Sequence, residues 1–243
     1  MFYKIIKAII KIKKYIWNVL GIDPISKIFK FIDKKLGGKY EILELFGGTG
    51  KLNTIYYQNK KSVNKLVIYE ILSSNCNELK KNCPNAVIKN VDTFSEIERC
   101  TEKFDIIISD NTPTLFGEYC EHFEIFPKIF RVAKDRFAVI FNIILDENDV
   151  SKSFYKIYPT LFSPEHLERR EKFYGVSNST NLNLQTAIQT YKKIGETKGY
   201  ILEDFYLIKR GRLTFVYFLA LIFSKSIDKN IHFKSNNEIV VKQ

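Results

Sequence analysis

The residues best suited to ligand chemistry lie within residues 41–54 of this 243-residue chain. A short apolar run ends in the acid Glu44, and Gly47, Gly48 and Gly50 follow at once. Glycine has no Cβ atom, so it can adopt a positive φ and lets a ligand lie against the backbone. A helix that begins after such a turn offers its free N–H groups. The pattern predicts a strand, a glycine turn and a helix around a nucleotide-like ligand.

Two common phosphate-binding motifs do not fit this turn. A P-loop needs a glycine five residues before Gly50 and Ser or Thr two residues after it, whereas Leu45 and Leu52 occupy those positions. The dinucleotide fingerprint needs a third glycine where Asn53 stands. Both motifs are therefore rejected.

The turn reads Glu-x-Phe-x-Gly-x-Gly over residues 44–50 and resembles motif I of the class I S-adenosylmethionine-dependent methyltransferases, in the variant where Phe replaces the first glycine. The resemblance implies an α/β, Rossmann-like fold with a mostly parallel seven-stranded sheet and a C-terminal antiparallel hairpin. It implies S-adenosylmethionine as the cofactor. The cofactor contacts that it implies in the turn are Glu44, Phe46, Gly47, Gly48 and Gly50.

A second acid ends the next buried strand, predicted over residues 65–70, twenty residues past Gly50. A carboxylate at this point can accept hydrogen bonds from both ribose hydroxyls of an adenosine. Glu70 is therefore the best single candidate for a cofactor contact, and the alternative is a solvent-exposed strand end. Ile71, which follows it, could lie against the adenine ring, as could Phe94.

A third strand is predicted over residues 86–90, and Asp92 and Thr93 follow it. In the family that the chain resembles, the third motif meets the adenine ring here. Asp92 could accept a hydrogen bond from the exocyclic amine, with Thr93 beside it. Asp92 could equally cap the helix that starts near Phe94, so both interpretations stay open.

The fourth strand, predicted over residues 104–110, ends at Asp110, and Asn111 follows. The resemblance implies that this strand end borders both the donor's sulfonium and the methyl acceptor. Asp110 and Asn111 are therefore expected to contact the cofactor, and Asp110 is also a catalytic candidate that orients the acceptor.

The residues around Asp110 also resemble motifs of nucleic-acid methyltransferases, but only in part. Asp-Asn-Thr-Pro is similar to the D-P-P-Y box of amino-methylating enzymes, with Thr112 in place of the first proline. Ser-Asp-x-x-Pro-x-x-x-Gly is similar to a ribosomal RNA ribose methyltransferase pattern. That family needs a lysine on the following strand, and none occurs between Phe137 and Ser151.

His122 is the second catalytic candidate. It lies early in the next predicted helix and could act as general base for a hydroxyl, oriented by Glu121 or Glu124. The alternative is a structural histidine. Three histidines and four cysteines without C-x-x-C spacing predict no metal site and reduced, cytosolic thiols.

The net charge of +11 is concentrated in a helical arm, residues 1–40. The arm holds ten lysines and two aspartates, a net +8, which leaves +3 for the remaining 203 residues. Its first helix is amphipathic and basic, and a second one begins at Asp23-Pro24. The arm could bind anionic lipid at the inner face of a membrane, bind nucleic-acid phosphates, or cover the mouth of its own cofactor site.

The remaining chain divides into a methyltransferase domain over residues 41–223 and a polar tail over residues 224–243. An insertion at about residues 146–199 is expected to wall the acceptor pocket. The largely apolar run of eleven residues from Leu213 to Phe223 is too short to span a bilayer as a helix, so it is predicted to be a buried seventh strand.

These features together predict a cytoplasmic enzyme that moves a methyl group from S-adenosylmethionine to an oxygen or nitrogen atom. The near-balanced charge beyond residue 40 favours a small-molecule or glycan-like acceptor. Two alternatives stay open. One is an RNA or DNA methyltransferase that uses the lysine-rich arm, and the other is a methyltransferase-like binding protein without catalytic activity.

Overall fold

The computed structural model describes residues 23–51, 53–110, 121–145, 163–176, 182–210 and 216–226. Asn111 lies outside the described residues, as do the first helix of the arm and most of the polar tail. The predicted contact of Asn111 with the cofactor therefore stays a prediction.

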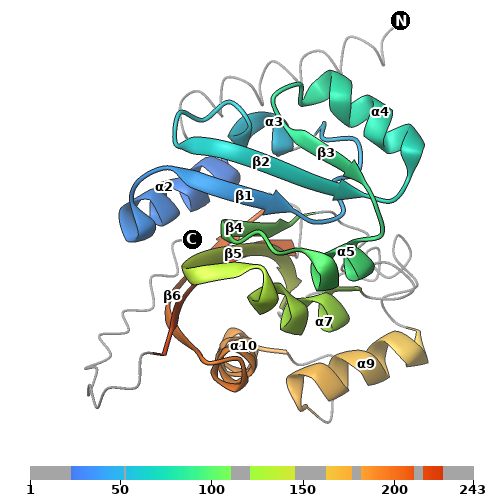
Figure 1. Cartoon of the computed structure of the whole chain (residues 1–243). Helices are drawn as coiled ribbons and strands as arrows, with labels where there is room; N and C mark the ends of the chain where they lie inside the picture. The colour runs from blue at the N-terminus through green and yellow to red at the C-terminus, as the bar shows by residue number, and fades with distance from the viewer. Residues whose placement is uncertain are drawn as a thin grey trace, which may run out of the picture.

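Seven strands form one sheet in the order β3-β2-β1-β4-β5-β7-β6 (Figure 1). The first five strands are parallel, whereas β7 runs antiparallel to both β5 and β6. This arrangement confirms the predicted fold class. The strands are β1 (Tyr40–Glu44), β2 (Val63–Glu70), β3 (Val87–Asn90), β4 (Phe104–Ser109), β5 (Ala133–Ile144), β6 (Tyr200–Lys209) and β7 (Val216–Lys225).

Helices cover both faces of the sheet (Figure 1). Three pack on one face, with side chains from each in one apolar cluster: α2 (Pro24–Leu36), α3 (Thr54–Tyr57) and α4 (Ser73–Asn82). The second cluster lies on the opposite face, against α5 (Thr93–Arg99), α7 (Glu121–Ile125), the 3-10 helix η1 (Phe126–Arg131), α9 (Pro164–Tyr174) and α10 (Leu184–Thr197). Within the described residues, no helix has the length and apolar character needed to cross a bilayer.

Strand β7 is apolar along its length because it is an inner strand. It pairs with β5 on one side and β6 on the other, and its residues from Val216 to Phe223 are buried. Phe223 faces one helical layer, where its ring stacks on Phe137, while Phe218 faces the other. A strand covered on both faces carries apolar residues without alternation. The predicted buried seventh strand is confirmed, at Val216–Lys225.

The second helix of the arm, α2, begins as the sequence indicates. The Asp23 carboxylate accepts a hydrogen bond from the Ile25 N–H at 3.3 Å, Pro24 occupies the first turn, and Gly37 ends the helix at φ +63°. Its apolar stripe is buried against the sheet at Ile25, Ile28, Phe29 and Ile32. Half of the predicted arm therefore packs on the domain, with Lys27, Lys30 and Lys34 exposed.

The glycine turn is held down by close packing against β2 and α4. A Cβ atom on Gly47 would lie 2.2 Å from Ile68 Cγ2, and one on Gly50 would lie 2.7 Å from Leu79 Cδ2. The Gly47 N–H also donates to the Tyr69 carbonyl at 2.9 Å. These contacts bring the turn over the end of β2, next to Glu70.

Candidate functional site

Three carboxylates meet at the carboxyl edge of the sheet. Glu44 ends β1, Glu70 ends β2, and Asp110 follows β4, which are neighbouring parallel strands. Their exposed fractions are 5%, 5% and 6%. Ligands of open α/β sheets bind at this edge, where the strand order reverses beside the first strand. The structure therefore brings the three predicted acids to one candidate site.

The Glu70 carboxylate binds the glycine turn. Its Oε2 accepts a hydrogen bond from the Gly48 N–H at 2.7 Å, and its Oε1 accepts one from the Leu72 N–H at 2.8 Å. Gly48 adopts φ +56°, which glycine tolerates without strain. Each carboxylate oxygen can still accept a second hydrogen bond, so this arrangement suits two ribose hydroxyls. Ile71, 62% exposed, offers an open apolar surface beside it.

Phe46 adopts a backbone conformation that bulky residues rarely take. Its φ is +56°, in the left-handed region, where a Cβ atom crowds the following carbonyl. Its ring packs edge-on against Phe94, with 6.0 Å between centroids. Phe46, which stands where motif I usually has its first glycine, therefore forms an aromatic pair with Phe94 of α5, the helix that follows β3.

Glu44 retains an unused acceptor. Its Oε1 accepts a hydrogen bond from Thr54 Oγ1 at 2.8 Å, while its Oε2 is buried without a hydrogen-bond partner among the described residues. Burial raises the pKa of Glu44 to about 8, which the nearby hydroxyls of Tyr57 and Thr54 offset only in part. A buried carboxyl with a free oxygen fits a ligand that donates an N–H from a cationic group.

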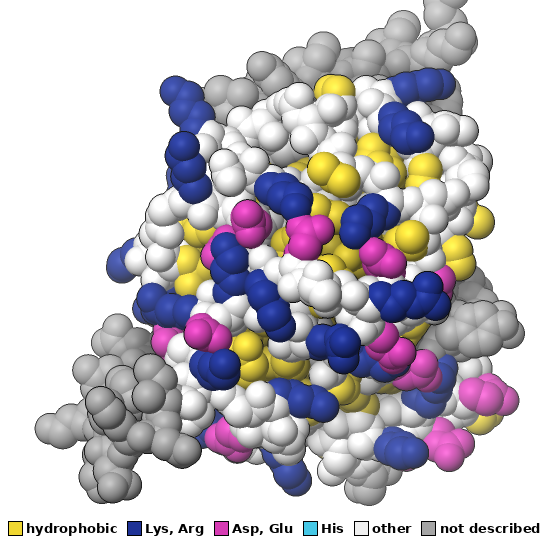
Figure 2. Space-filling view, in the orientation of Figure 1, with side chains coloured by type: hydrophobic (Ala, Val, Ile, Leu, Met, Phe, Trp, Pro, Cys, Tyr) yellow, Lys and Arg dark blue, Asp and Glu magenta, His cyan; other side chains and the backbone are white. Residues whose placement is uncertain are grey.

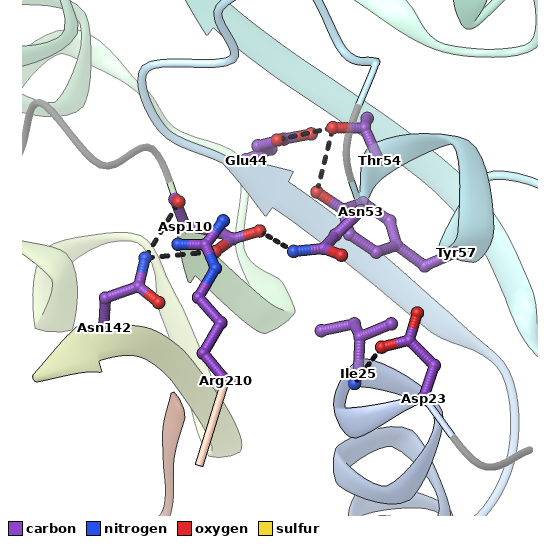
Figure 3. A network of polar contacts seen from close by, with 9 residues as sticks. All are labelled: Asp23, Ile25, Glu44, Asn53, Thr54, Tyr57, Asp110, Asn142 and Arg210. Carbon is purple, nitrogen blue, oxygen red and sulfur yellow. Dashed lines mark hydrogen bonds and ion pairs between the residues drawn. The ribbon is translucent and has the colours of Figure 1, made fainter. Parts of the chain in front are cut away.

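Asp110 lies at the centre of a polar network that no motif marks (Figure 3). Asn53 Nδ2 donates to its Oδ2, and Asn142 Nδ2 donates to its carbonyl at 2.8 Å and to its Oδ1 at 3.0 Å. The Arg210 guanidinium lies 3.4 Å from Oδ1. Asn142 carries a sequence signal, because it is a single amide within an otherwise apolar run of β5, and the structure shows it fully buried. Asn53 and Arg210 carry no such signal.

Asp92 and Thr93 lie at the start of α5, and Asp92 caps this helix. Its Oδ2 accepts hydrogen bonds from the Ser95 N–H at 3.0 Å and from Ser95 Oγ at 2.7 Å. These two bonds keep the pKa of Asp92 below its ordinary value. Thr93 is 2% exposed. The capping interpretation is seen directly, and the predicted contacts of both residues with an adenine ring stay predictions.

His122 lies inside an aromatic cluster. It is 2% exposed, and its Nε2 lies 2.9 Å from the hydroxyl of Tyr191. Burial lowers the pKa of His122 to about 3, so the imidazole is neutral and a poor proton acceptor at neutral pH. This placement favours a structural role over the predicted catalytic one. The rings around it belong to Phe123, Phe126, Phe141, Phe173 and Tyr191.

The described residues contain no group of three or more histidine, cysteine or acidic side chains placed to hold a metal ion. Cys76, Cys83 and Cys100 are free thiols.

The buried His122 predicts a loss of stability in acid. The unfolded chain takes up a proton at this side chain below its ordinary pKa of 6.5, but the folded chain does so only near 3. Stability should therefore fall as pH decreases from about 6.5, by up to roughly 1.4 kcal/mol per pH unit. Thermal unfolding followed between pH 7.5 and 5 measures the effect.

In that experiment His122→Phe should unfold with a shallower dependence on pH than the unmodified chain. His166, whose pKa burial lowers to about 4, acts in the same direction, so His166→Phe should also reduce the slope. Equal slopes for His122→Phe and the unmodified chain would contradict the buried neutral state of His122.

Comparison with known proteins gives no match by sequence: no protein-family profile matches the chain, and no curated protein sequence does. By structure, NodS, an N-methyltransferase of Bradyrhizobium japonicum WM9, matches with a TM-score of 0.51 at 9% identity. That match covers 83% of this chain and 94% of NodS.

Two further solved structures match similarly. The plantazolicin methyltransferase BamL, solved with SAH (S-adenosylhomocysteine) and a plantazolicin analogue, has a TM-score of 0.52 at 13% identity, covering 80% of each chain. A methyltransferase of Pyrococcus furiosus has a TM-score of 0.50 at 17% identity, covering 84% of this chain and 83% of its own. The chain therefore has the fold of the class I S-adenosylmethionine-dependent methyltransferases, as the resemblance at residues 44–50 predicted.

Proposed function

We propose that this chain is a methyltransferase that uses S-adenosylmethionine and transfers its methyl group to an oxygen or nitrogen atom. The observation that carries the proposal is the Glu70 carboxylate, held against the glycine turn by the Gly48 N–H at 2.7 Å. This arrangement places a carboxylate that can accept hydrogen bonds from a ribose beside a glycine turn, at the sheet edge where this fold binds ligands.

The residues at this edge suit each part of the cofactor. Glu70 would hold the ribose, and the free Oε2 of Glu44 would accept an N–H from the amino group of the methionine portion. Phe46 and Ile71 would enclose the adenine with apolar surface. The bound cofactor supplies an activated methyl group, so the protein mainly aligns the reactants.

Asp110 would orient the acceptor and take up its proton where the acceptor is a hydroxyl or an amine. It is held by two asparagine amides, which leaves the orientation of its carboxylate well defined. A reacting group fixed in this way contributes through alignment rather than through covalent chemistry.

A small-molecule or glycan-like acceptor is favoured by the surface charge. On the face drawn in Figure 2, basic and acidic side chains are intermixed. Many charged side chains of the described residues are paired, as in Lys128 with Glu98 at 2.6 Å and Arg136 with Glu203 at 2.6 Å. A polynucleotide enzyme would be expected to gather unpaired cations around its site. The free thiols support the predicted cytoplasmic location.

One observation supports an anionic macromolecule as the second candidate partner. Lys27, Lys30 and Lys34 lie at helical spacing on the exposed face of α2, and none has an ion-pair partner among the described residues. Such a stripe is suited to nucleic-acid phosphates or to anionic lipid headgroups at a membrane surface. It would extend the basic sequence of the first 22 residues.

The first test concerns the cofactor. Glu70→Gln should weaken S-adenosylmethionine binding by roughly ten- to a hundredfold, because a charge-assisted hydrogen bond to ribose contributes about 1.5–3 kcal/mol. Titration calorimetry measures the affinity. Glu102→Gln, at the exposed carboxylate paired with Lys65, serves as the matched control and should bind normally. Unchanged affinity in Glu70→Gln would refute the assigned ribose contact.

The second test uses the raised pKa of Glu44, about 8. At pH 7 this carboxyl is mostly protonated, and a cationic amino group next to it would favour ionisation. Cofactor binding should therefore release up to one proton, and affinity should rise with pH towards 8. Calorimetry in buffers of different ionisation enthalpy counts the protons. Glu44→Gln should release none, and equal proton release by both proteins would count against Glu44 as the amino-group contact.

The third test separates the candidate acceptors. Transfer of a labelled methyl group is measured into fractionated small molecules and glycans and into RNA, each at 50 and 200 mM salt. Turnover of a small acceptor should change little with salt, whereas transfer to RNA would fall steeply. If RNA is the acceptor, replacing Lys27, Lys30 and Lys34 by glutamine should remove much of the salt dependence. Cofactor binding without transfer to any fraction would support a non-catalytic protein.

A further inference from the structure

Arg210 occupies an unusual position for a charged residue. It follows β6 directly, and its N–H donates to the Val216 carbonyl at 2.9 Å, which ties together the two strands of the C-terminal hairpin. Its side chain is only 20% exposed. The guanidinium carbon lies 5.1 Å from the centre of the Phe218 ring, so the side chain extends over β7 towards the middle of the sheet.

The strand register carries this side chain to the candidate site. Phe218 lies opposite Asn142 where β7 pairs with β5, and Asn142 donates two hydrogen bonds to Asp110. Arg210 and Asn142 therefore approach Asp110 from the same side, as Figure 3 shows. The contact joins the last hairpin of the fold to the end of β4.

The contact acts through charge more than through hydrogen bonding. Arg210 Nη1 lies 3.4 Å from Asp110 Oδ1, yet this buried nitrogen makes no hydrogen bond with any described residue. Asn53 and Asn142, which do donate to Asp110, are neutral amides. In a site of such low exposure the charge of a guanidinium is screened little by water.

Among the described residues, Glu44 and Tyr57 are two further titratable groups that interact electrostatically with Asp110, and both become anions when they lose a proton. Once Glu44 ionises, as we expect on cofactor binding, its negative charge disfavours the ionised form of Asp110, and the adjacent Arg210 cation opposes this effect. The more exposed ion pair of Arg136 on β5 and Glu203 on β6 lies outside this buried network and provides a control.

We propose that Arg210 is a positioning residue that keeps the Asp110 carboxylate charged and oriented for methyl transfer. This inference rests on the proposed function, since it assigns the role of Asp110 to that reaction. Arg210 acts through Asp110 and so links the C-terminal hairpin to the candidate site at the end of β4.

The experiment compares Arg210→Met, Arg210→Lys and Arg136→Met. Methionine retains apolar contact with Phe218 but removes the charge, whereas lysine keeps the charge. Because Asp110 is also a predicted cofactor contact, Arg210→Met should bind S-adenosylmethionine about tenfold more weakly at pH 7, and its loss of binding in acid should begin about one pH unit higher. Arg210→Lys should recover most of the affinity, and Arg136→Met should match the unmodified protein. A purely structural role would lower the unfolding temperature without moving the acid limb, and that result would overturn the proposal.

A double-mutant cycle without ligand separates this proposal from the proposed function. Arg210→Met, Asp110→Asn and the double variant are compared in denaturant unfolding. Interaction between the two side chains should appear as a coupling of about tenfold in the unfolding equilibrium constant. Additive effects would overturn the proposal even where the cofactor binds. If the unmodified protein does not bind S-adenosylmethionine, the proposed function fails, and the role of Arg210 as a positioning residue fails with it. The double-mutant cycle still decides in that case whether Arg210 and Asp110 interact.

Discussion

Desolvation of three carboxylates is the constraint on which the site depends. Glu44, Glu70 and Asp110 are each about 95% buried, and a buried carboxylate is costly unless donors or cations surround it. Each acid meets this requirement differently. Glu70 takes two backbone N–H groups, Asp110 takes two amides and a guanidinium, and Glu44 takes one hydroxyl and a raised pKa. The glycine turn, the α3 region and the C-terminal hairpin are therefore all tied to one edge of the sheet.

The fold could be predicted because its signals are local. Strands β1, β2 and β4 each contain a short apolar run, and Glu44, Glu70 and Asp110 stand at or just after the ends of these strands. Parallel strands place their carboxyl ends at one edge, so three acids far apart in sequence could be expected to meet. The start of α2 at Asp23-Pro24 could be predicted for the same reason, because a capping side chain and a proline act within one helical turn.

The partners of these acids could not be predicted, because they depend on distances across the sheet. Arg210 is 100 residues beyond Asp110 and reaches it only because β7 inserts between β5 and β6. His122 was ambiguous for the same reason. Its neighbours, including Tyr191, come from other elements, and only their packing shows that the ring is enclosed. A sequence pattern indicates that a histidine lies on a helix, but its environment decides its pKa.

The strand order also has a consequence for synthesis on the ribosome. Strand β7, the last of the described strands, lies between two strands made before it, so β5 lacks its β7 partner until Val216–Lys225 has emerged. Until then the apolar surface of β5 and an open row of backbone N–H and C=O groups are exposed to other nascent chains. Chaperone protection during translation would therefore be needed most between the emergence of β5 and that of β7.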